Sequence, residues 1–334
     1  MFLCVFWKNS CLKNYRSLHC RIMTATNSTA AEKQFETFQQ LRCSAAWATG
    51  IHGPLNYLSA LNIFLCITTV LGNTLILVAL RKVSSLNPSS KLLLRCLATT
   101  DLCVGLITEP LNVVYWMSVA QEEWKLCRYT LASLVIVGYT LCSVSLLTVT
   151  AISVDRLLAL LLSLRYRQVV TLERTYVIVA IVWITSAIAS IFHLLNPVIT
   201  AWYGRIITPV CLVTSIASYT KIFLKLRHHQ IQILRHDQQE QPSRINPLNI
   251  ERYRKAVCSA LWVQCILIAC YLPFSVVRAL IRYSRNISRS VLIFELATTL
   301  IYLNSSLNPI LYCWKISEVK NAVKETIREA LCCF

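Results

Sequence analysis

The chain has 334 residues, of which 56% are apolar and only 14% are charged. An ordinary soluble domain has roughly 25% charged residues, so this composition argues against a soluble protein and favours a membrane protein. The 33 Lys and Arg residues outnumber the 15 Asp and Glu residues, which gives a net charge of +18. These basic residues lie between apolar stretches rather than on one polar domain, so we assign them to membrane flanks and expect no nucleic-acid partner.

Seven apolar runs have the length that a helix needs to cross a bilayer, which is about 20 residues. They cover residues 58–80, 92–116, 129–158, 176–195, 206–226, 257–280 and 291–314. We therefore predict an all-α membrane protein, a seven-transmembrane helix bundle. Residues 1–56 would precede the bundle, residues 57–314 would form it, and residues 315–334 would follow it, with loops at 196–205 and 228–249.

The orientation follows from the Lys and Arg residues of the short loops. Residues 81–91 carry three basic residues and no acid, and residues 221–255 carry eight basic residues against three acids. Both segments are expected on the cytoplasmic side, with the N-terminus outside, although three arginines between 282 and 289 oppose this. Glycosylation sequons at Asn27 and Asn286 fall on the outer side of this topology.

The segment after residue 315 has apolar residues every three or four positions, with a basic stripe beside them. This pattern predicts a short amphipathic eighth helix on the inner membrane surface. Its final residues, Cys332 and Cys333, are candidates for palmitoylation, with unmodified thiols as the alternative.

A carboxylate inside a membrane span is costly and is by default a functional candidate. Asp101 is such a residue, because apolar sequence surrounds it on both sides within the second run. The alternative is a purely structural carboxylate that is hydrogen-bonded to neighbouring helices.

Ordered motifs in the runs carry a resemblance to a known family. The first run holds Gly72-Asn73 and the second Asp101, the third ends in Asp155-Arg156-Leu157, and the fourth holds Trp183. The sixth and seventh runs hold 270-CYLP-273 and 308-NPILY-312. Together these motifs resemble the rhodopsin-like, G-protein-coupled receptors over nearly all of residues 57–331. The resemblance implies a plasma-membrane receptor that binds an extracellular ligand and activates a heterotrimeric G protein, and it implies no enzyme activity.

The family resemblance also assigns roles to residues. Relatives hold an allosteric sodium ion with the second-helix acid, and the matching residues here are Asp101, Ser145, Asn304, Ser305 and Asn308. Their oxygen-bearing side chains suit a hard cation, and no other cofactor is expected. The residues matching G-protein coupling and activation are Asp155, Arg156, Leu164, Tyr219, Tyr271, Pro273, Asn308, Pro309 and Tyr312. In relatives, the Arg that Arg156 matches pairs with the adjacent Asp at rest and swings toward the G protein on activation. Without this family role, Arg156 would be an interfacial anchor.

Several positions depart from the family pattern. Tyr253 replaces the acid that usually locks the resting sixth helix, which predicts appreciable basal signalling, and Tyr271 stands where most relatives have Trp. The usual disulfide cannot form because position 131 is Leu and residues 196–205 contain no Cys. Cys43 and Cys127 are an alternative pair. Residues 1–22 are basic and Cys-rich, so we expect Met23 to be the native start.

The chain lacks residues that some receptor classes need to bind their ligands, and this narrows the class of its ligand. Gly138 occupies the position of the aminergic carboxylate and Tyr302 that of the visual-pigment Lys. The missing loop bridge and the short second outer loop resemble the melanocortin, lysophospholipid, cannabinoid and adenosine receptors, and the melanocortin receptors share most of these absences. The candidate ligand is a peptide, a lipid or a small molecule. The candidate ligand-binding residues are Glu109, Gly138, Phe274, Arg278 and Glu295.

Arg278 follows the sixth-helix Pro by five residues, where adenosine receptors carry an Asn, which argues against a nucleoside. An Arg can hold a carboxylate or phosphate with two parallel hydrogen bonds, and the alternative is an interfacial Arg. Glu109 and Glu295 would bind a basic ligand or pair with Arg278. A transporter is the rival from another class, but we find no internal repeats of the kind that transporters carry.

Overall fold

A computed structural model of the chain describes residues 42–45, 52–84, 86–162, 165–195, 197–239, 247–280, 287–315 and 317–332. These residues form helices and short turns and contain no strand. The helical segments are α4 (His52–Lys82), α5 (Pro88–Cys103), η1 (Val104–Thr108), α6 (Glu109–Ala120), α7 (Trp124–Ser133), η2 (Leu134–Gly138), α8 (Tyr139–Leu162), α9 (Tyr166–Val169), α10 (Leu172–Leu195), α11 (Pro197–Gln239), α12 (Pro247–Leu280), α13 (Ile287–Lys315) and α14 (Ser317–Cys332).

These segments make seven spans. The second span joins α5, η1 and α6, the third joins α7, η2 and α8, and the other five are α4, α10, α11, α12 and α13. Within the described ranges, six helical stretches are long and apolar enough to cross a membrane, and α12 adds the shorter apolar stretch Cys265–Leu280. This is the predicted seven-helix bundle.

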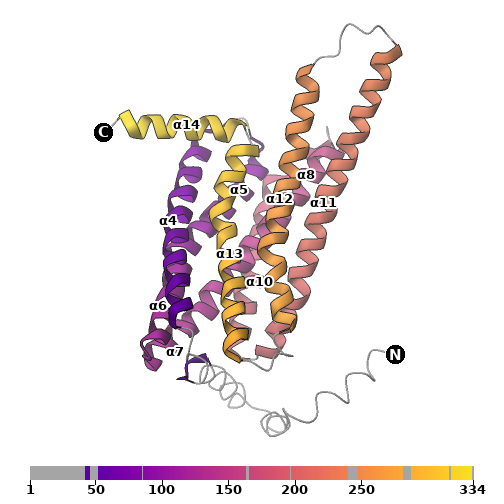
Figure 1. Cartoon of the computed structure of the whole chain (residues 1–334). Helices are drawn as coiled ribbons and strands as arrows, with labels where there is room; N and C mark the ends of the chain where they lie inside the picture. The colour runs from indigo at the N-terminus through magenta and orange to yellow at the C-terminus, as the bar shows by residue number, and fades with distance from the viewer. Residues whose placement is uncertain are drawn as a thin grey trace, which may run out of the picture.

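The bundle has two distinct ends (Figure 1). Helix α14 lies across one end, beside the last turns of α4 and α13, whereas α7 begins at the opposite end. We refer to them as the α14 end and the α7 end. The strongly amphipathic α14 is the predicted eighth helix. Lys82 at the end of α4 forms an ion pair with Glu329 of α14 at 2.5 Å.

Two short π-helical segments interrupt the second and third spans. The first, η1, ends directly before Glu109-Pro110. A proline ring clashes with the carbonyl group four residues earlier in a regular α-helix, so the wider turn of η1 relieves the contact between Pro110 and Leu106. The second, η2, packs against η1. A Cβ atom on Gly138 would lie 3.1 Å from the methyl group of Thr108, so the glycine permits this close approach.

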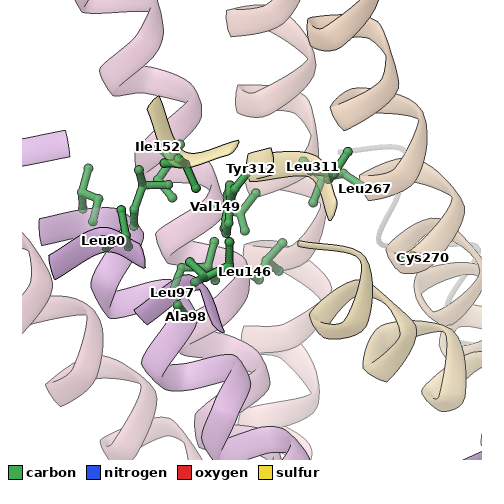
Figure 2. Close-up of a cluster of buried hydrophobic side chains, with 14 of the residues drawn as sticks. Leu80, Leu97, Ala98, Leu146, Val149, Ile152, Leu267, Cys270, Leu311 and Tyr312 are labelled. Atoms are coloured by element: carbon green, nitrogen blue, oxygen red, sulfur yellow. The ribbon is translucent and has the colours of Figure 1, made fainter. Parts of the chain in front are cut away.

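The apolar core toward the α14 end is built from side chains of several spans that point toward one another (Figure 2). The labelled residues are Leu80, Leu97, Ala98, Leu146, Val149, Ile152, Leu267, Cys270, Leu311 and Tyr312. In the same region α4 and α13 approach closely, because a Cβ atom on Gly72 would lie 2.9 Å from Pro309 Cγ. The glycine and the proline of the two family motifs therefore meet across the bundle.

Two predicted loops are mostly helical. Helix α10 ends at Leu195 and α11 begins at Pro197, so the expected loop at 196–205 was wrong. Proline is favoured at the first helical position, where its missing N–H has no helical partner to lose. Helix α11 also continues to Gln239, well into the expected loop at 228–249, because Gln, Leu and Arg in that segment are good helix formers.

Candidate functional site

Asp101 lies at the centre of a buried hydrogen-bond cluster that joins three spans. Its carboxylate is fully buried. Ser145 of α8 and Ser305 of α13 donate to Asp101 Oδ1 at 3.0 and 2.9 Å, and Asn308 of α13 donates to Oδ2 at 2.7 Å. Four of the five predicted sodium-site residues are therefore in direct contact.

Asn304 is the fifth predicted sodium-site residue. Its side chain is buried, and neither its amide nitrogen nor its oxygen has a hydrogen-bond partner among the described residues. A buried amide of this kind calls for a partner, and a cation or a water molecule would supply one. The carboxylate, hydroxyl and amide oxygens around Asp101 thus fit a hard monovalent cation.

A second buried carboxylate, Asp155, lies toward the α14 end. Arg156 Nη2 lies 3.5 Å from Asp155 Oδ2, which closes the ion pair that the family motif implies for the resting state. Ser90 of α5 donates to the same oxygen at 2.8 Å, and Tyr166 of α9 donates to Oδ1 at 2.5 Å. The carboxylate therefore has three partners from three segments.

Ser90 and Tyr166 were missed from the sequence. Both are common residue types in polar loop-flanking sequence, and Tyr166 follows Asp155 by 11 residues, so no local pattern links them to the carboxylate. Burial, followed by the hydrogen bond to Asp155, raises the pKa of Tyr166 to about 12, so the phenol stays neutral and remains a donor.

Removing the Tyr166 hydroxyl should loosen this resting contact. In a Tyr166→Phe variant, Asp155 loses one donor of a charge-assisted hydrogen bond, an interaction worth about 1.5–3 kcal/mol. We expect ligand-independent G-protein activation to rise severalfold at equal surface expression. Tyr176→Phe, an exposed tyrosine on α10, is the matched control. Unchanged basal signalling in Tyr166→Phe would show that this donor does not hold the resting state.

The predicted activation residues of α11, α12 and α13 are placed around the apolar core. Tyr219, Tyr271 and Tyr312 are all buried in the core cluster. The Tyr312 hydroxyl has no hydrogen-bond partner within the described part of the chain. Pro273 and Pro309 lie inside α12 and α13, where prolines produce kinks.

The two acids predicted to bind ligand, Glu109 and Glu295, have partners other than Arg278. Glu295 of α13 forms an ion pair with Arg42, which precedes the first span. Glu109 accepts a hydrogen bond from Thr69 of α4 at 3.2 Å. The alternative that these acids pair with Arg278 was therefore wrong, because each meets a nearer donor that the linear sequence does not reveal.

Arg278 lies among aromatic side chains. Its guanidinium carbon is 5.9 Å from the ring centroids of both Tyr139 and Phe274, and the Phe274 ring lies 5.4 Å from that of Phe294. A Cβ atom on Gly204 of α11 would lie 2.7 Å from the Tyr139 hydroxyl and 2.8 Å from Arg278 Nη1. Because Gly204 has no side chain, the Arg278 guanidinium fits against α11 at this point.

The other predicted disulfide, ligand-binding and palmitoylation residues lie at both ends and in the middle of the bundle. A disulfide joins Cys43 to Cys127 at the start of the third span. Gly138 lies in the contact between η1 and η2 described above. Cys332 is exposed at the end of α14. The described residues do not include Asn27, Asn286, Leu164, Cys333 or Met23, and they exclude the side chain of Tyr253.

Comparison with known proteins agrees with this arrangement. A sequence model of the family "7 transmembrane receptor (rhodopsin family)" matches residues 72–211. Adenosine receptor A3 of Ovis aries is 24% identical over 298 residues, which cover 81% of this chain and 89% of that protein. Adenosine receptors are among the groups that the missing loop bridge and short outer loop predicted.

These similarities favour a receptor over the transporter and over any enzyme, and the family match at residues 72–211 includes Asp101, Ser145 and Asp155. The structure adds the seven spans, the eighth helix and the ion pair between Asp155 and Arg156 of the family motif. The chain is thus similar to the rhodopsin-like G-protein-coupled receptors, and its function is that of a receptor that binds an extracellular ligand and couples to a G protein.

Proposed function

We propose that this receptor resides in the plasma membrane with its α7 end outside, and that its ligand carries a carboxylate or phosphate group that Arg278 binds. The orientation is supported by the basic residues Arg81 and Lys82 in the last turn of α4 at the α14 end, since cytoplasmic loops carry an excess of Lys and Arg. The coupling residues around Asp155 then face the G protein.

The Arg278 site carries the ligand proposal. No ion pair within the described ranges includes Arg278, and the aromatic rings of Tyr139 and Phe274 flank it. A guanidinium between aromatic faces keeps its planar hydrogen-bonding edge available for a bidentate anion.

The charge balance of the α7 end favours an anion as well. Glu295 is neutralised by Arg42, and Glu109 is fully buried beside Thr69. Arg278 thus has no carboxylate partner among the described residues. A ligand anion would supply that partner, whereas a ligand cation would meet like charge.

The test uses ligand pairs that share a scaffold and differ in whether they carry an anionic group, and activation is read by G-protein dissociation in cells. One pair is adenosine and the 5′-phosphonate analogue of its monophosphate, and the other is a long-chain fatty acid and its methyl ester. We expect activation by an anionic member and weak or no activation by its neutral counterpart. Arg278→Gln should lower the potency of the active anion by roughly tenfold or more, the loss typical of a charge-assisted hydrogen bond.

Two glycine variants provide a matched control. Gly204→Ala places a methyl group against the Tyr139 hydroxyl and Arg278, so it should lower anion potency in the same direction as Arg278→Gln. Gly53→Ala adds the same atom where nothing lies within 4 Å, so it should leave potency unchanged. Equal potency of charged and neutral members in the wild type would exclude the anion site.

A nucleoside is the second candidate, because the similarity to an adenosine receptor covers 81% of the chain. Adenosine activating the wild type and Arg278→Gln with the same potency would support it in place of the anion. The panel therefore separates the two ligand classes in one experiment.

Sodium binding at Asp101 is also part of the proposal. The ion would be held by oxygen atoms of Asp101, Ser145, Asn304 and Ser305, with Asn308 completing the polar cluster. The support is the fit of the donor set and the buried amide of Asn304. An ion there neutralises the buried carboxylate of the second span.

A further inference from the structure

Residues 42–45, which precede the first span, are anchored within the α7 end of the bundle. Cys43 is only 4% exposed and packs in a core cluster with Leu55, Tyr115, Trp116 and Cys127. Its disulfide to Cys127 fixes the segment covalently to α7. The segment is therefore part of the packed structure at this end.

Arg42, the residue before that anchor, reaches a different span. Its guanidinium forms an ion pair with Glu295 of α13, and the two side chains are only 13% and 3% exposed. The guanidinium carbon lies 5.9 Å from the Tyr115 ring centroid and 5.5 Å from that of Phe294. The carboxylate pairs with the guanidinium and two aromatic rings lie beside it, and these are the charged and cation–π contacts that recognise a guanidinium group.

We propose that Glu295, Tyr115 and Phe294 form a guanidinium-binding site whose resident ligand is the receptor's own Arg42, and that this self-binding holds the receptor in its resting arrangement. The neighbouring residues Arg42 and Cys43 together tie α13 to α7. Arg42 also contacts α6 through Tyr115. The second, third and seventh spans are thus joined at one end by two adjacent residues.

The ion pair at the α14 end indicates whether release of Arg42 should raise or lower basal activity. The Arg156–Asp155 pair, which belongs to the resting state in this family, is closed in the same structure in which Arg42 occupies the Glu295 site. A contact made in one state shifts the population toward that state by its differential free energy. Release of Arg42 should therefore raise the active population without any added ligand.

The experiment measures ligand-independent G-protein activation, normalised to receptor at the cell surface. Arg42→Gln and Glu295→Gln should each raise it roughly fivefold, at the low end of typical coupling between sites. The double variant should match either single variant rather than their product, because both break one contact. The charge reversal Arg42→Glu with Glu295→Arg should return activation toward the wild-type level.

Lys125→Gln is the matched control, because Lys125 is an exposed cation two residues from Cys127 and makes no contact with Glu295. It should leave basal activation unchanged. A second measurement needs no charge substitution: a membrane-impermeant reductant applied to cells should raise basal activation of the wild type but not of a Cys43→Ser, Cys127→Ser double variant, whose basal level is already raised.

Basal activation that is unchanged or lower in both single variants at wild-type surface expression would overturn the proposal. Failure of the charge reversal to restore the resting level would do the same. The proposal rests on the receptor function but not on the Arg278 anion site, because its readout contains no added ligand. The two can therefore fail separately.

Discussion

Replacing Arg156 with alanine is expected to leave the receptor at the cell surface but to reduce agonist-stimulated nucleotide exchange by about tenfold or more, or about 1.4 kcal/mol. Asp155 keeps its donors Ser90 and Tyr166 in this variant, so the carboxylate is still satisfied and the fold should survive. The lost group is the one that family members swing toward the G protein. Cell-surface staining and nucleotide exchange on membranes measure the two properties separately.

Arg174→Gln is the control for the Arg156 prediction. Arg174 is an exposed arginine near the same end, where it donates to the Val169 carbonyl at 2.8 Å. Its removal should leave signalling near the wild-type level. Wild-type signalling from Arg156→Ala would remove the coupling role from this residue.

In an Asp101→Asn variant, we expect agonist potency to lose its dependence on sodium. Asparagine has nearly the same shape, but it removes the charge that a cation needs, and its NH₂ group cannot accept the hydrogen bond that Asn308 donates. The measurement is an agonist dose-response curve in sodium chloride and in isosmotic N-methylglucamine chloride. The wild-type curve should shift between the two salts, and the variant curves should superimpose.

Glu109→Gln is the control for the sodium prediction. Glu109 is also fully buried and lies eight positions further along the same span, yet it contacts Thr69 rather than the Asp101 cluster. This variant should keep the salt-dependent shift. An equal shift in Asp101→Asn and the wild type would show that sodium does not act through Asp101.

The seven spans were predictable because each needs a long apolar stretch, and a stretch such as 58–80 is visible in composition alone. The helix ends were less predictable. Outside the bilayer, hydropathy no longer distinguishes a helix from a loop, so it does not predict the first turns of α11 or its extension to Gln239. The π segment η1 was also hidden, although Pro110 gives a physical reason for it.

The candidate sites also include contacts that the sequence predicts and contacts that it does not predict. The Asp101 cluster follows from motifs that recur in the family, and four of its members are in direct contact. The Arg42–Glu295 pair joins residues separated by 253 positions, and it depends on how the segment before the first span folds back. No local pattern encodes such a contact. The same holds for Ser90 and Tyr166 at Asp155.

Helices α11 and α12 extend beyond the other spans at the α14 end (Figure 1). Pro247, where α12 begins, precedes Pro273 by 26 residues, which is about 39 Å of helix at 1.5 Å per residue. A rigid rod of that length hinged at Pro273 moves its far tip by about 7 Å for a tilt of about 10°. Hinged in this way, the helix would work as a lever arm, in which a small angular change near the ligand becomes a displacement of side-chain dimensions at the G protein.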